Sequence, residues 1–166
     1  MPAEIKPIAP AEIPALLGLI RELAIFEKLE REMEATVESL HESLFGPKPA
    51  AGALLAHENG KIVAYAIYFF TFSSFVGRRG IWLEDVYVQP PFRHQGIGRR
   101  LIEAVARIGA EANCGRYEWT ALNWNKPALD VYRKMGARAM EDWILLRLDA
   151  DGLRKLASES PPESRS

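Results

Sequence analysis

The chain has 166 residues, of which 48% are hydrophobic and 26% charged, and its formal net charge at pH 7 is -1. These values are typical of one globular domain with a sizeable core, and they argue against a nucleic-acid binder that relies on bulk positive charge. The single cysteine excludes an intrachain disulfide and a cysteine-rich zinc site. The apolar runs are too short to span a bilayer, and no signal peptide is recognisable, so a cytoplasmic location is expected.

The N-terminal part of the chain predicts a short strand and two helices. Residues 5–8 are expected to form the strand, and apolar residues then recur at helical spacing from Ile13 to Ala24. Pro14 is compatible with this helix because it falls in the first turn. Thr36 is a suitable N-cap for a second helix that Gly46 ends. Residues 47–52 then form a linker.

The middle of the chain predicts a hairpin, a third strand and a long helix. Strands over residues 53–57 and 61–71 flank Asn59-Gly60, a strong signal for a hairpin turn. A loop over residues 73–80 leads to a strand over residues 81–88. The helix after it carries Leu101, Val105 and Ile108 on one face and ends at Gly115.

The C-terminal part predicts further alternation of strands and helices. We expect strands over residues 116–122 and 144–148, a helix from Pro127 to Gly136, and a short helix over residues 153–157. The polar residues 158–166 are expected to be a disordered tail. The whole pattern predicts a mixed α/β sheet in a single domain over residues 1–157.

The most informative motif joins the strand over residues 81–88 to the long helix. Gly96 and Gly98 let backbone N–H groups approach an anion, and the start of the helix adds the positive end of its dipole. Arg93, Arg99 and Arg100 add positive charge. The loop therefore predicts a pyrophosphate site, although an ordinary glycine-containing turn before a helix has the same residues. It is neither a P-loop nor the dinucleotide fingerprint.

Arg93-x-x-Gly96-x-Gly98 resembles the acetyl-CoA signature of the GCN5-related (GNAT) N-acetyltransferases. Four further segments resemble the spermidine/spermine and thialysine N-acetyltransferases, in the same order and at the same separations. They are residues 21–27, 83–88, 124–128 and 131–137. The resemblance implies the GNAT fold, with a central, mostly antiparallel twisted sheet flanked by helices. It also implies a homodimer that uses acetyl-CoA, without a metal.

The resemblance assigns Tyr132 as the general acid that protonates the departing CoA thiolate. A phenol of pKa about 10 is protonated at neutral pH and can donate this proton. A core tyrosine on an amphipathic helix would have the same spacing with Leu129 and Met135.

Glu84 and Asp85 are adjacent carboxylates in an apolar strand. Strand alternation predicts that their side chains lie on opposite faces, so that one of them meets the active-site cleft. By resemblance Glu84 contacts the acceptor amine and accepts its proton. The alternative is a salt-bridged or exposed pair.

The resemblance also implies the cofactor and acceptor contacts. The backbone of a splayed strand is expected to pair with the pantetheine arm, and main-chain N–H groups of the loop are expected to surround the pyrophosphate. Asn125 is expected to bond the CoA arm or, alternatively, to cap its helix. The cofactor contacts are Val86, Tyr87, Val88, Arg93, His94, Gln95, Gly96, Ile97, Gly98, Arg99, Asn125, Pro127, Ala128 and Tyr132.

The acceptor is expected to contact Phe26, Glu27 and Glu84, and also Glu118, Trp119 and Thr120. The last three residues, and the segment after Ala137, differ from the animal enzymes, which leaves the identity of the acceptor open. The acidic residues that follow Phe26 would attract a diamine, a polyamine or a lysine-like amine, and a mixed-charge solvated helix end would have the same composition. Alternative functions are an amino-acid or protein N-acetyltransferase and an acetyl-CoA sensor without turnover. Neither nucleic acid nor a membrane is an expected partner.

Overall fold

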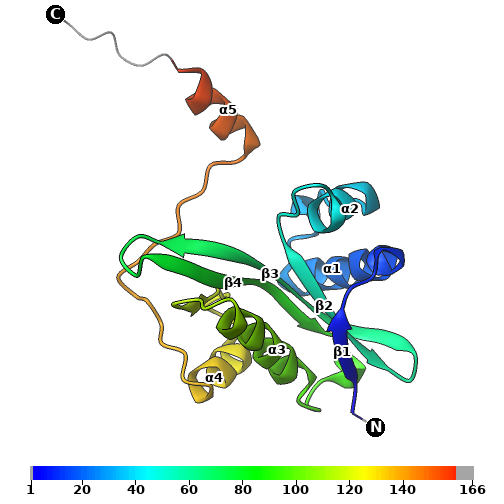
Figure 1. Cartoon of the computed structure of the whole chain (residues 1–166). Helices are drawn as coiled ribbons and strands as arrows, with labels where there is room; N and C mark the ends of the chain where they lie inside the picture. The colour runs from blue at the N-terminus through cyan, green and yellow to red at the C-terminus, as the bar shows by residue number, and fades with distance from the viewer. Residues whose placement is uncertain (1, 160–166) are drawn as a thin grey trace, which may run out of the picture. The chain divides into compact units, whose positions relative to one another are not determined.

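The computed structural model describes residues 2–159 and contains one five-stranded sheet in the order β1-β2-β3-β4-β5 (Figure 1). The first three strand pairs are antiparallel and the last is parallel. A mixed, mostly antiparallel sheet flanked by helices is therefore confirmed. The strands are β1 (Glu4–Pro7), β2 (Gly52–Glu58), β3 (Lys61–Ser73), β4 (Arg78–Val88) and β5 (Tyr117–Glu118).

The helices begin largely where the capping signals predict. Pro14 lies in the first turn of α1, and the Thr36 hydroxyl accepts a hydrogen bond from the Ser39 N–H at 3.1 Å to cap α2. The α-helices are α1 (Ile13–Glu27), α2 (Val37–Phe45), α3 (Ile97–Glu111), α4 (Lys126–Lys134) and α5 (Ala150–Ser158), and the 3-10 turns are η1 (Pro10–Glu12), η2 (Glu30–Glu32) and η3 (Pro90–Phe92).

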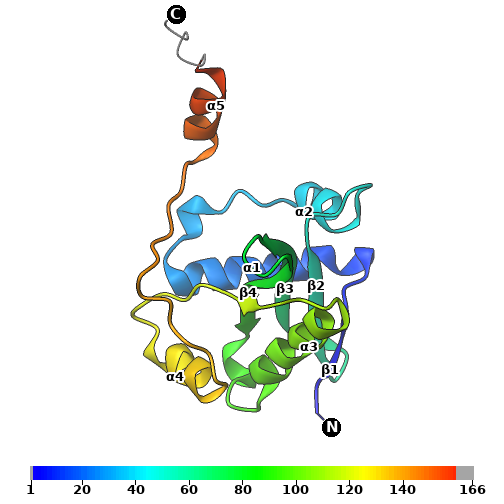
Figure 2. The same cartoon turned by 60° about the vertical axis from the view of Figure 1, so that its left-hand side comes forward.

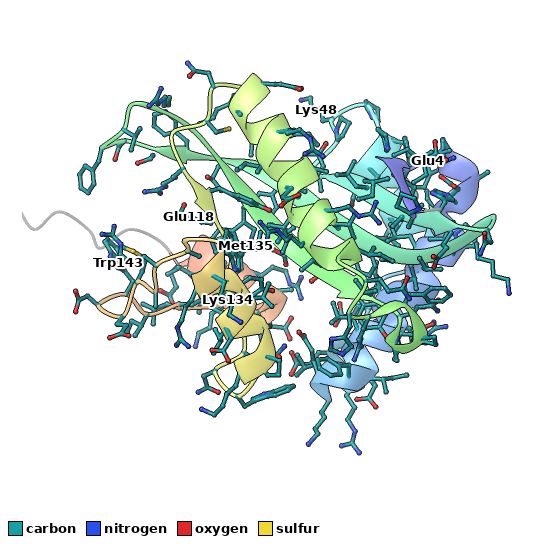
Figure 3. All side chains as sticks on the ribbon, turned by 90° about the horizontal axis from the view of Figure 1, so that it is seen from below. Glu4, Lys48, Glu118, Lys134, Met135 and Trp143 are labelled. Carbon is teal, nitrogen blue, oxygen red and sulfur yellow. The ribbon has the colours of Figure 1, made fainter. Side chains whose placement is uncertain are left out.

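Helices α1 and α3 cover opposite faces of the sheet (Figure 2). On the α1 face, Leu16, Leu55 and Tyr65 are fully buried in one apolar cluster. On the other face α3 crosses the sheet (Figure 3), and its residue Gly109 lies so close to Ile81 that a Cβ there would come within 2.7 Å of the Ile81 side chain. This close packing fixes the position of α3 relative to β4.

Two turns explain the course of the middle strands. Asn59 and Gly60 have φ of 49° and 77°, as the predicted hairpin turn requires. The β3–β4 ladder contains a bulge, because Ile67 lies opposite Asp85 while its neighbour Tyr68 lies opposite Leu83. Glu84 is therefore an extra residue in β4, and the side-chain alternation changes at this point.

Several elements differ from the sequence prediction. The loop predicted over residues 73–80 is shorter, because β4 begins at Arg78. The strand predicted over residues 116–122 is only two residues long, and α3 ends at Glu111 rather than at Gly115. The strand predicted over residues 144–148 is wrong. An apolar run becomes a strand only where a neighbouring strand bonds its backbone, and residues 144–148 pair with no strand in the described part of the chain.

The described chain forms two compact units, Met1–Thr120 and Ala121–Ser166, and each is treated by itself below. The single domain over residues 1–157 stays a prediction. Ser158 belongs to α5 rather than to the predicted tail, and residues 160–166 lie outside the described residues. Among residues 2–159, no helix is both long and apolar enough to cross a membrane.

Candidate active site

The predicted pyrophosphate loop lies between β4 and α3. Gly96 is the N-cap of α3 with φ of 76°, a left-handed conformation that strongly favours glycine. His94 is also left-handed, with φ of 63°, and its side chain is exposed. The buried Ile97 anchors the first turn of α3. The N–H groups of that turn have no acceptor within the helix, so the geometry fits an anionic phosphate.

Gly98 lets α3 approach β4. A Cβ at Gly98 would lie 3.4 Å from the nearest methyl carbon of Val88, which is van der Waals contact. The two glycines of the motif thus serve different purposes: Gly96 supplies a backbone conformation, and Gly98 supplies close packing.

The three arginines of the motif carry the predicted positive charge, but each already donates a hydrogen bond to another group of the chain. Arg93 donates from Nε to the Val88 carbonyl oxygen at 2.9 Å, and Arg100 donates to the Ala3 carbonyl oxygen at 2.8 Å. The exposed Arg99 pairs with Glu103 at 2.8 Å, one helical turn away. An anion at this loop would therefore depend mainly on main-chain N–H groups.

One edge of β4 is open beside this loop. In the described chain β5 pairs with β4 only at Ile81 and Trp82, so residues 83–88 are bonded along the β3 edge alone. Because the N–H and C=O groups of successive strand residues alternate between the two edges, only some of the backbone groups of residues 86–88 face this open edge. The Val88 carbonyl oxygen already accepts from Arg93, and the others on this edge are available to an extended ligand. An open strand edge that ends at a phosphate-binding helix start suits the pantetheine arm and pyrophosphate of a CoA ester.

The bulge places both adjacent carboxylates on the α1 face. Asp85 lies opposite Ile67, and Trp82 lies opposite Phe69, which is on the same face of β3 as Ile67. Glu84 accepts a hydrogen bond from the Trp82 indole Nε1 at 3.0 Å, so it shares that face. The prediction of opposite faces is therefore wrong, because it assumed regular alternation through Glu84.

The two carboxylates differ in environment. Glu84 is exposed, whereas Asp85 is partly buried and accepts a hydrogen bond from the Tyr65 hydroxyl at 3.3 Å. Burial raises the pKa of Asp85 to about 6, and the negative charges of Glu84 and Glu27 add to this rise. The hydrogen bond from Tyr65 acts in the opposite direction and lowers the pKa. Burial also raises the pKa of Glu27.

The C-terminal end of α1 contacts the cofactor loop. The guanidinium of Arg93 lies 5.2 Å from the ring centre of Phe26 and 5.5 Å from that of Tyr87, within cation–π range. Glu22 accepts hydrogen bonds from the Tyr87 hydroxyl at 3.2 Å and from the Gln89 amide at 2.9 Å. The structure therefore brings the predicted acceptor residue Phe26 beside the predicted cofactor residues Tyr87 and Arg93.

Comparison with known proteins agrees with this geometry. Residues 19–137, well over half of the chain, match the Acetyltransferase (GNAT) family.

The chain belongs to the GNAT acetyltransferase family.

Its similarity to individual GNAT proteins extends over nearly the whole chain. It is 36% identical over 155 residues to thialysine N-epsilon-acetyltransferase of Sus scrofa, covering 87% of this chain and 91% of that protein. A Vibrio cholerae integron cassette protein superposes with a TM-score of 0.79 at 27% identity, covering 96% of this chain and 99% of that one. An aminoglycoside N-acetyltransferase solved with CoA has the same fold, with a TM-score of 0.66 at 20% identity over 89% of this chain and all of that one.

Membership of the GNAT family makes the chain an N-acetyltransferase, and GNAT acetyltransferases use acetyl-CoA. The open edge of β4 and the α3 N-terminus are the features of this chain that fit that co-substrate. His94, Gln95 and Arg99 are the remaining predicted cofactor contacts of the loop. Their side chains all face solvent, so a ligand could reach them.

The other predicted acceptor residues of the first unit lie in β5 and directly after it. Glu118 lies beside Trp82 in the sheet and pairs with Arg116 at 2.7 Å, and it is labelled in Figure 3. Trp119 packs edge-on against Tyr117, with ring centres 4.9 Å apart, and Thr120 is exposed. The two-residue β5 of this GNAT chain thus presents one carboxylate, that of Glu118, and Arg116 already pairs with it.

The second unit carries the remaining predicted residues on α4. The Asn125 side chain accepts from the Ala128 N–H at 3.4 Å, so the capping role is observed, and a bond to the CoA arm stays a prediction. Pro127 lies in the first turn. Tyr132 is half-buried near the end of this nine-residue helix. The general-acid role assigned to it by resemblance stays a prediction.

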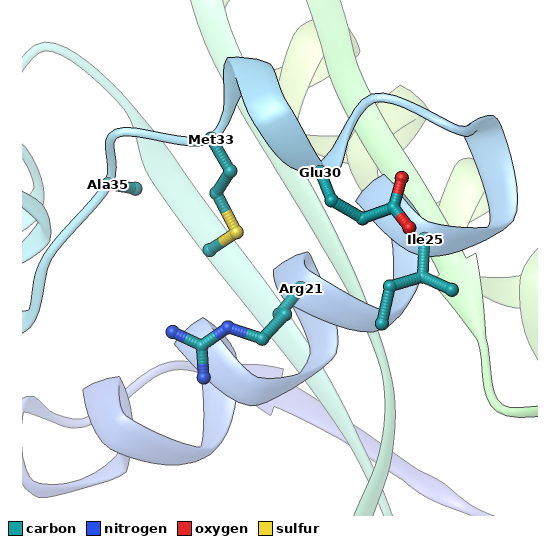
Figure 4. A pocket seen from close by; sticks show the side chains of 5 residues that line it. All are labelled: Arg21, Ile25, Glu30, Met33 and Ala35. Atoms are coloured by element: carbon teal, nitrogen blue, oxygen red, sulfur yellow. The ribbon is translucent and has the colours of Figure 1, made fainter.

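A separate shallow pocket opens between α1 and the segment that leads to α2. It is lined by Arg21, Ile25, Glu30, Met33 and Ala35 (Figure 4). None of the predicted cofactor or acceptor residues lines it, and its walls combine one cation, one carboxylate and apolar side chains. This pocket is therefore separate from the predicted site around Glu84 and Asp85 at the β4 bulge.

Sequence reasoning assigned no role to Tyr65 or Glu22. Both face β4 from neighbouring elements, and their partners depend on strand register and helix placement. Their sequence signal is slight: Tyr65 is a polar-tipped residue inside an otherwise apolar strand.

Proposed function

We propose that this N-acetyltransferase transfers the acetyl group of acetyl-CoA directly to a primary amine of a small diamine, polyamine or lysine-like acceptor. The observation that carries the acceptor class is the group of carboxylates on the α1 face, where the negative charges of Glu84 and Glu27 act on Asp85. Negative charge at this face attracts and orients a small cation. The acceptor named for the Sus scrofa relative, thialysine, is a small amine of this kind.

In this mechanism bound acetyl-CoA supplies an activated acetyl thioester. Main-chain N–H groups of Gly96 to Arg99 hold the pyrophosphate, and the open edge of β4 aligns the pantetheine arm. A β4 N–H directed at the thioester oxygen would stabilise the charge that develops there. Asn125, Pro127 and Ala128 of α4 are further proposed contacts of acetyl-CoA, on the resemblance of their motif.

Proton transfers at both ends of the reaction fall to two side chains. An acceptor amine is mostly an ammonium at pH 7, and Glu84 accepts the proton that frees its lone pair. The C–N bond then forms and the C–S bond breaks. Tyr132 donates its phenolic proton to the departing sulfur. The nitrogen loses its second proton once the C–N bond has formed, and a proton from solvent or from that nitrogen restores the phenol of Tyr132. No acetyl-enzyme is required, because the amine attacks the thioester itself.

The test is steady-state kinetics in which both substrates are varied. Direct transfer predicts intersecting double-reciprocal lines, whereas an acetyl-enzyme would produce parallel lines. Replacement of the exposed Glu84 by Gln should lower kcat by about 10²- to 10³-fold and remove the acidic limb of the pH–rate profile. An unchanged profile in this variant would remove Glu84 from the mechanism.

The same proposal includes a homodimer in the cytoplasm that binds neither nucleic acid nor membrane. The net charge of -1 supports the absence of a nucleic-acid partner. Support for a second copy comes from the apolar run at residues 143–146, whose side chains are 69–82% exposed in the described chain. Apolar side chains at this density are typical of surfaces that a partner covers.

A further inference from the structure

The C-terminal end of β4 is held by a side chain of α1 as well as by the sheet. Tyr87 and Gln89 are two residues apart on an extended chain, so their side chains point to the same face. Glu22 of α1 accepts a hydrogen bond from each of them. The Tyr87 hydroxyl donates to Oε2 at 3.2 Å, and the Gln89 amide donates to Oε1 at 2.9 Å. Both oxygens of the Glu22 carboxylate are therefore engaged with the end of β4.

These two hydrogen bonds are partly shielded from solvent. Tyr87 is only 6% exposed, and Glu22 and Gln89 are partly buried. Both donors are neutral groups, and a charged acceptor makes a stronger hydrogen bond than a neutral one does. A donor left without its acceptor at such a position loses more than an exposed one would, because water replaces the lost bond poorly there. The contact is therefore strong enough to fix the two side chains.

The β4 backbone needs such support at this point. Within the described chain, residues 83–88 are bonded to a neighbouring strand on one side only. The Gln89 N–H donates to the Val63 carbonyl oxygen at 3.0 Å, and its side chain is held by Glu22. Val88, which borders the open edge, lies between the two residues that Glu22 holds. A segment with few backbone restraints opens more readily than a central strand, so these side-chain bonds restrict its motion.

The next turn of α1 contacts the glycine-containing loop. Phe26 follows Glu22 by four residues, so the two side chains share one face of the helix. The guanidinium of Arg93 lies 5.2 Å from the Phe26 ring centre. The same helix is anchored in the core through Leu16 and Leu19. Helix α1 therefore ties the end of β4 and the start of the loop to the core of the first unit.

We propose that Glu22 is a positioning residue that aligns the open edge of β4 for acetyl-CoA through Tyr87 and Gln89. The inference rests on the proposed function, because it takes this edge as the site of the pantetheine arm. Glu22 acts through the β4 backbone and not by touching the co-substrate. An edge that is already ordered binds its ligand at a smaller entropic cost. Loss of the Glu22 contacts should therefore weaken CoA binding and leave the acceptor contacts unchanged.

The experiment compares the wild type with Glu22→Ala, Gln89→Glu and the double variant Glu22→Gln/Gln89→Glu. Gln89→Glu alone sets two carboxylates against each other. In the double variant, the amide introduced at position 22 can donate to the carboxylate introduced at position 89, which restores the bond in the opposite direction. Glu111→Ala is the matched control, since Glu111 is an exposed helix residue at the end of α3.

Two measurements at pH 8 do not depend on turnover. In calorimetry we expect the Kd for CoA to rise about 5- to 20-fold in Glu22→Ala and in Gln89→Glu, as the lost hydrogen bonds leave the edge less ordered. In the ligand-free protein, hydrogen exchange at the Gln89 N–H should be about 10-fold faster in these two variants. The double variant and Glu111→Ala should return both quantities to the wild-type values.

Steady-state kinetics with thialysine as the acceptor separate positioning from a general loss of structure. The KM for acetyl-CoA should follow the Kd for CoA, while the KM for the acceptor stays at the wild-type value. A merely structural role would accelerate exchange throughout the sheet, and the double variant would then be worse than Gln89→Glu. Circular dichroism verifies that each variant is folded. If Glu22→Ala does not fold, the comparison of Gln89→Glu with the double variant decides.

Wild-type CoA affinity in a folded Glu22→Ala variant would overturn the inference, and so would a double variant that binds CoA no better than Gln89→Glu. A wild type that binds CoA but acetylates no amine would overturn the proposed function, while calorimetry and hydrogen exchange would still test Glu22. A wild type that does not bind CoA would overturn both.

Discussion

At the residue scale, one extra residue in β4 decides the chemistry of the site. Regular alternation would have placed Glu84 and Asp85 on opposite faces of the sheet, but the bulge places both on the α1 face. The exposed Glu84 can reach a substrate, and the partly buried Asp85 is held by Tyr65. Two carboxylates that are neighbours in sequence thereby acquire different environments.

Tyr132→Phe tests the proposed general acid. The substitution removes the phenolic hydroxyl and keeps the ring, so we expect kcat to fall by about 10²- to 10⁴-fold, the usual range for loss of acid–base catalysis. Acetyl-CoA affinity, measured by calorimetry, should be retained. Tyr117→Phe, the same change in β5, is the control and should keep full turnover. Equal kcat in Tyr132→Phe and the wild type would exclude the role.

The raised pKa of Asp85 leads to a prediction for the stability of the fold. Its pKa is raised from 3.8 to about 6, so the folded chain binds the proton more tightly than the unfolded chain does. The stability that this provides is complete below about pH 4 and is lost as the pH rises through 6, with an upper limit of about 3 kcal/mol. Asp85→Asn should therefore raise the melting temperature at pH 7.5 and have little effect at pH 4.

Thermal denaturation at the two pH values measures this difference. Asp130→Asn is the control, since Asp130 is exposed and paired with Arg133, and it should show no such pH-dependent gain. A lower melting temperature for Asp85→Asn at pH 7.5 would contradict the assignment.

At the element scale, the start of α3 combines a backbone requirement with the proposed binding of the phosphates. Both Gly96 and Gly60 have positive φ and open space around the position of a Cβ. Alanine at either position should destabilise the chain by a similar amount, about 1 kcal/mol. Only Gly96→Ala should also weaken acetyl-CoA binding, by about 5- to 10-fold, because it distorts the N–H groups around the phosphates. Equal CoA affinity in the two variants would argue against the loop as the phosphate site.

Elements with strong local signals were predictable from the sequence. As predicted, α2 begins after Thr36 and ends before Gly46, and Asn59-Gly60 forms the turn between β2 and β3. The glycine motif also lies at the start of α3, as predicted. These signals depend on a few neighbouring residues, so tertiary context changes them little.

Features that depend on partners could not be predicted. The bulge at Glu84 requires knowledge of the β3–β4 register, and the hydrogen bond between Tyr65 and Asp85 follows from it. The strand expected over residues 144–148 needed a neighbouring strand, and the described chain offers none. Likewise the charge of the arginines in the phosphate loop was predictable, but the backbone carbonyl oxygens to which two of them donate were not.

At the scale of the whole molecule, the two compact units differ in how they are stabilised. The buried residues of the described chain all lie before residue 112, in the unit built around the sheet. The second unit contains α4 and α5 and exposes Trp143, Ile144 and Leu146. A segment of this size without buried side chains depends on contacts beyond itself.

The proposed homodimer predicts that polar substitution in this segment lowers the association constant. Leu146→Lys, at a position that is 82% exposed in the described chain, should dissociate dimers in sedimentation equilibrium. Lys155→Ala, on the exposed surface of α5, should leave the dimer intact. A wild-type chain that sediments as a monomer at all concentrations would contradict the dimer.

The measurement that tests the central claim most directly is acetyl transfer to a panel of amines. The wild-type chain and acetyl-CoA are incubated with putrescine, spermidine, thialysine, lysine and a lysine peptide, while CoA release and the mass of the product are followed. The account predicts release of one CoA for each acetylated amine, with a preference for small acceptors that carry a primary amine. CoA binding without acetyl transfer to any of these amines would contradict it and favour a sensor without turnover.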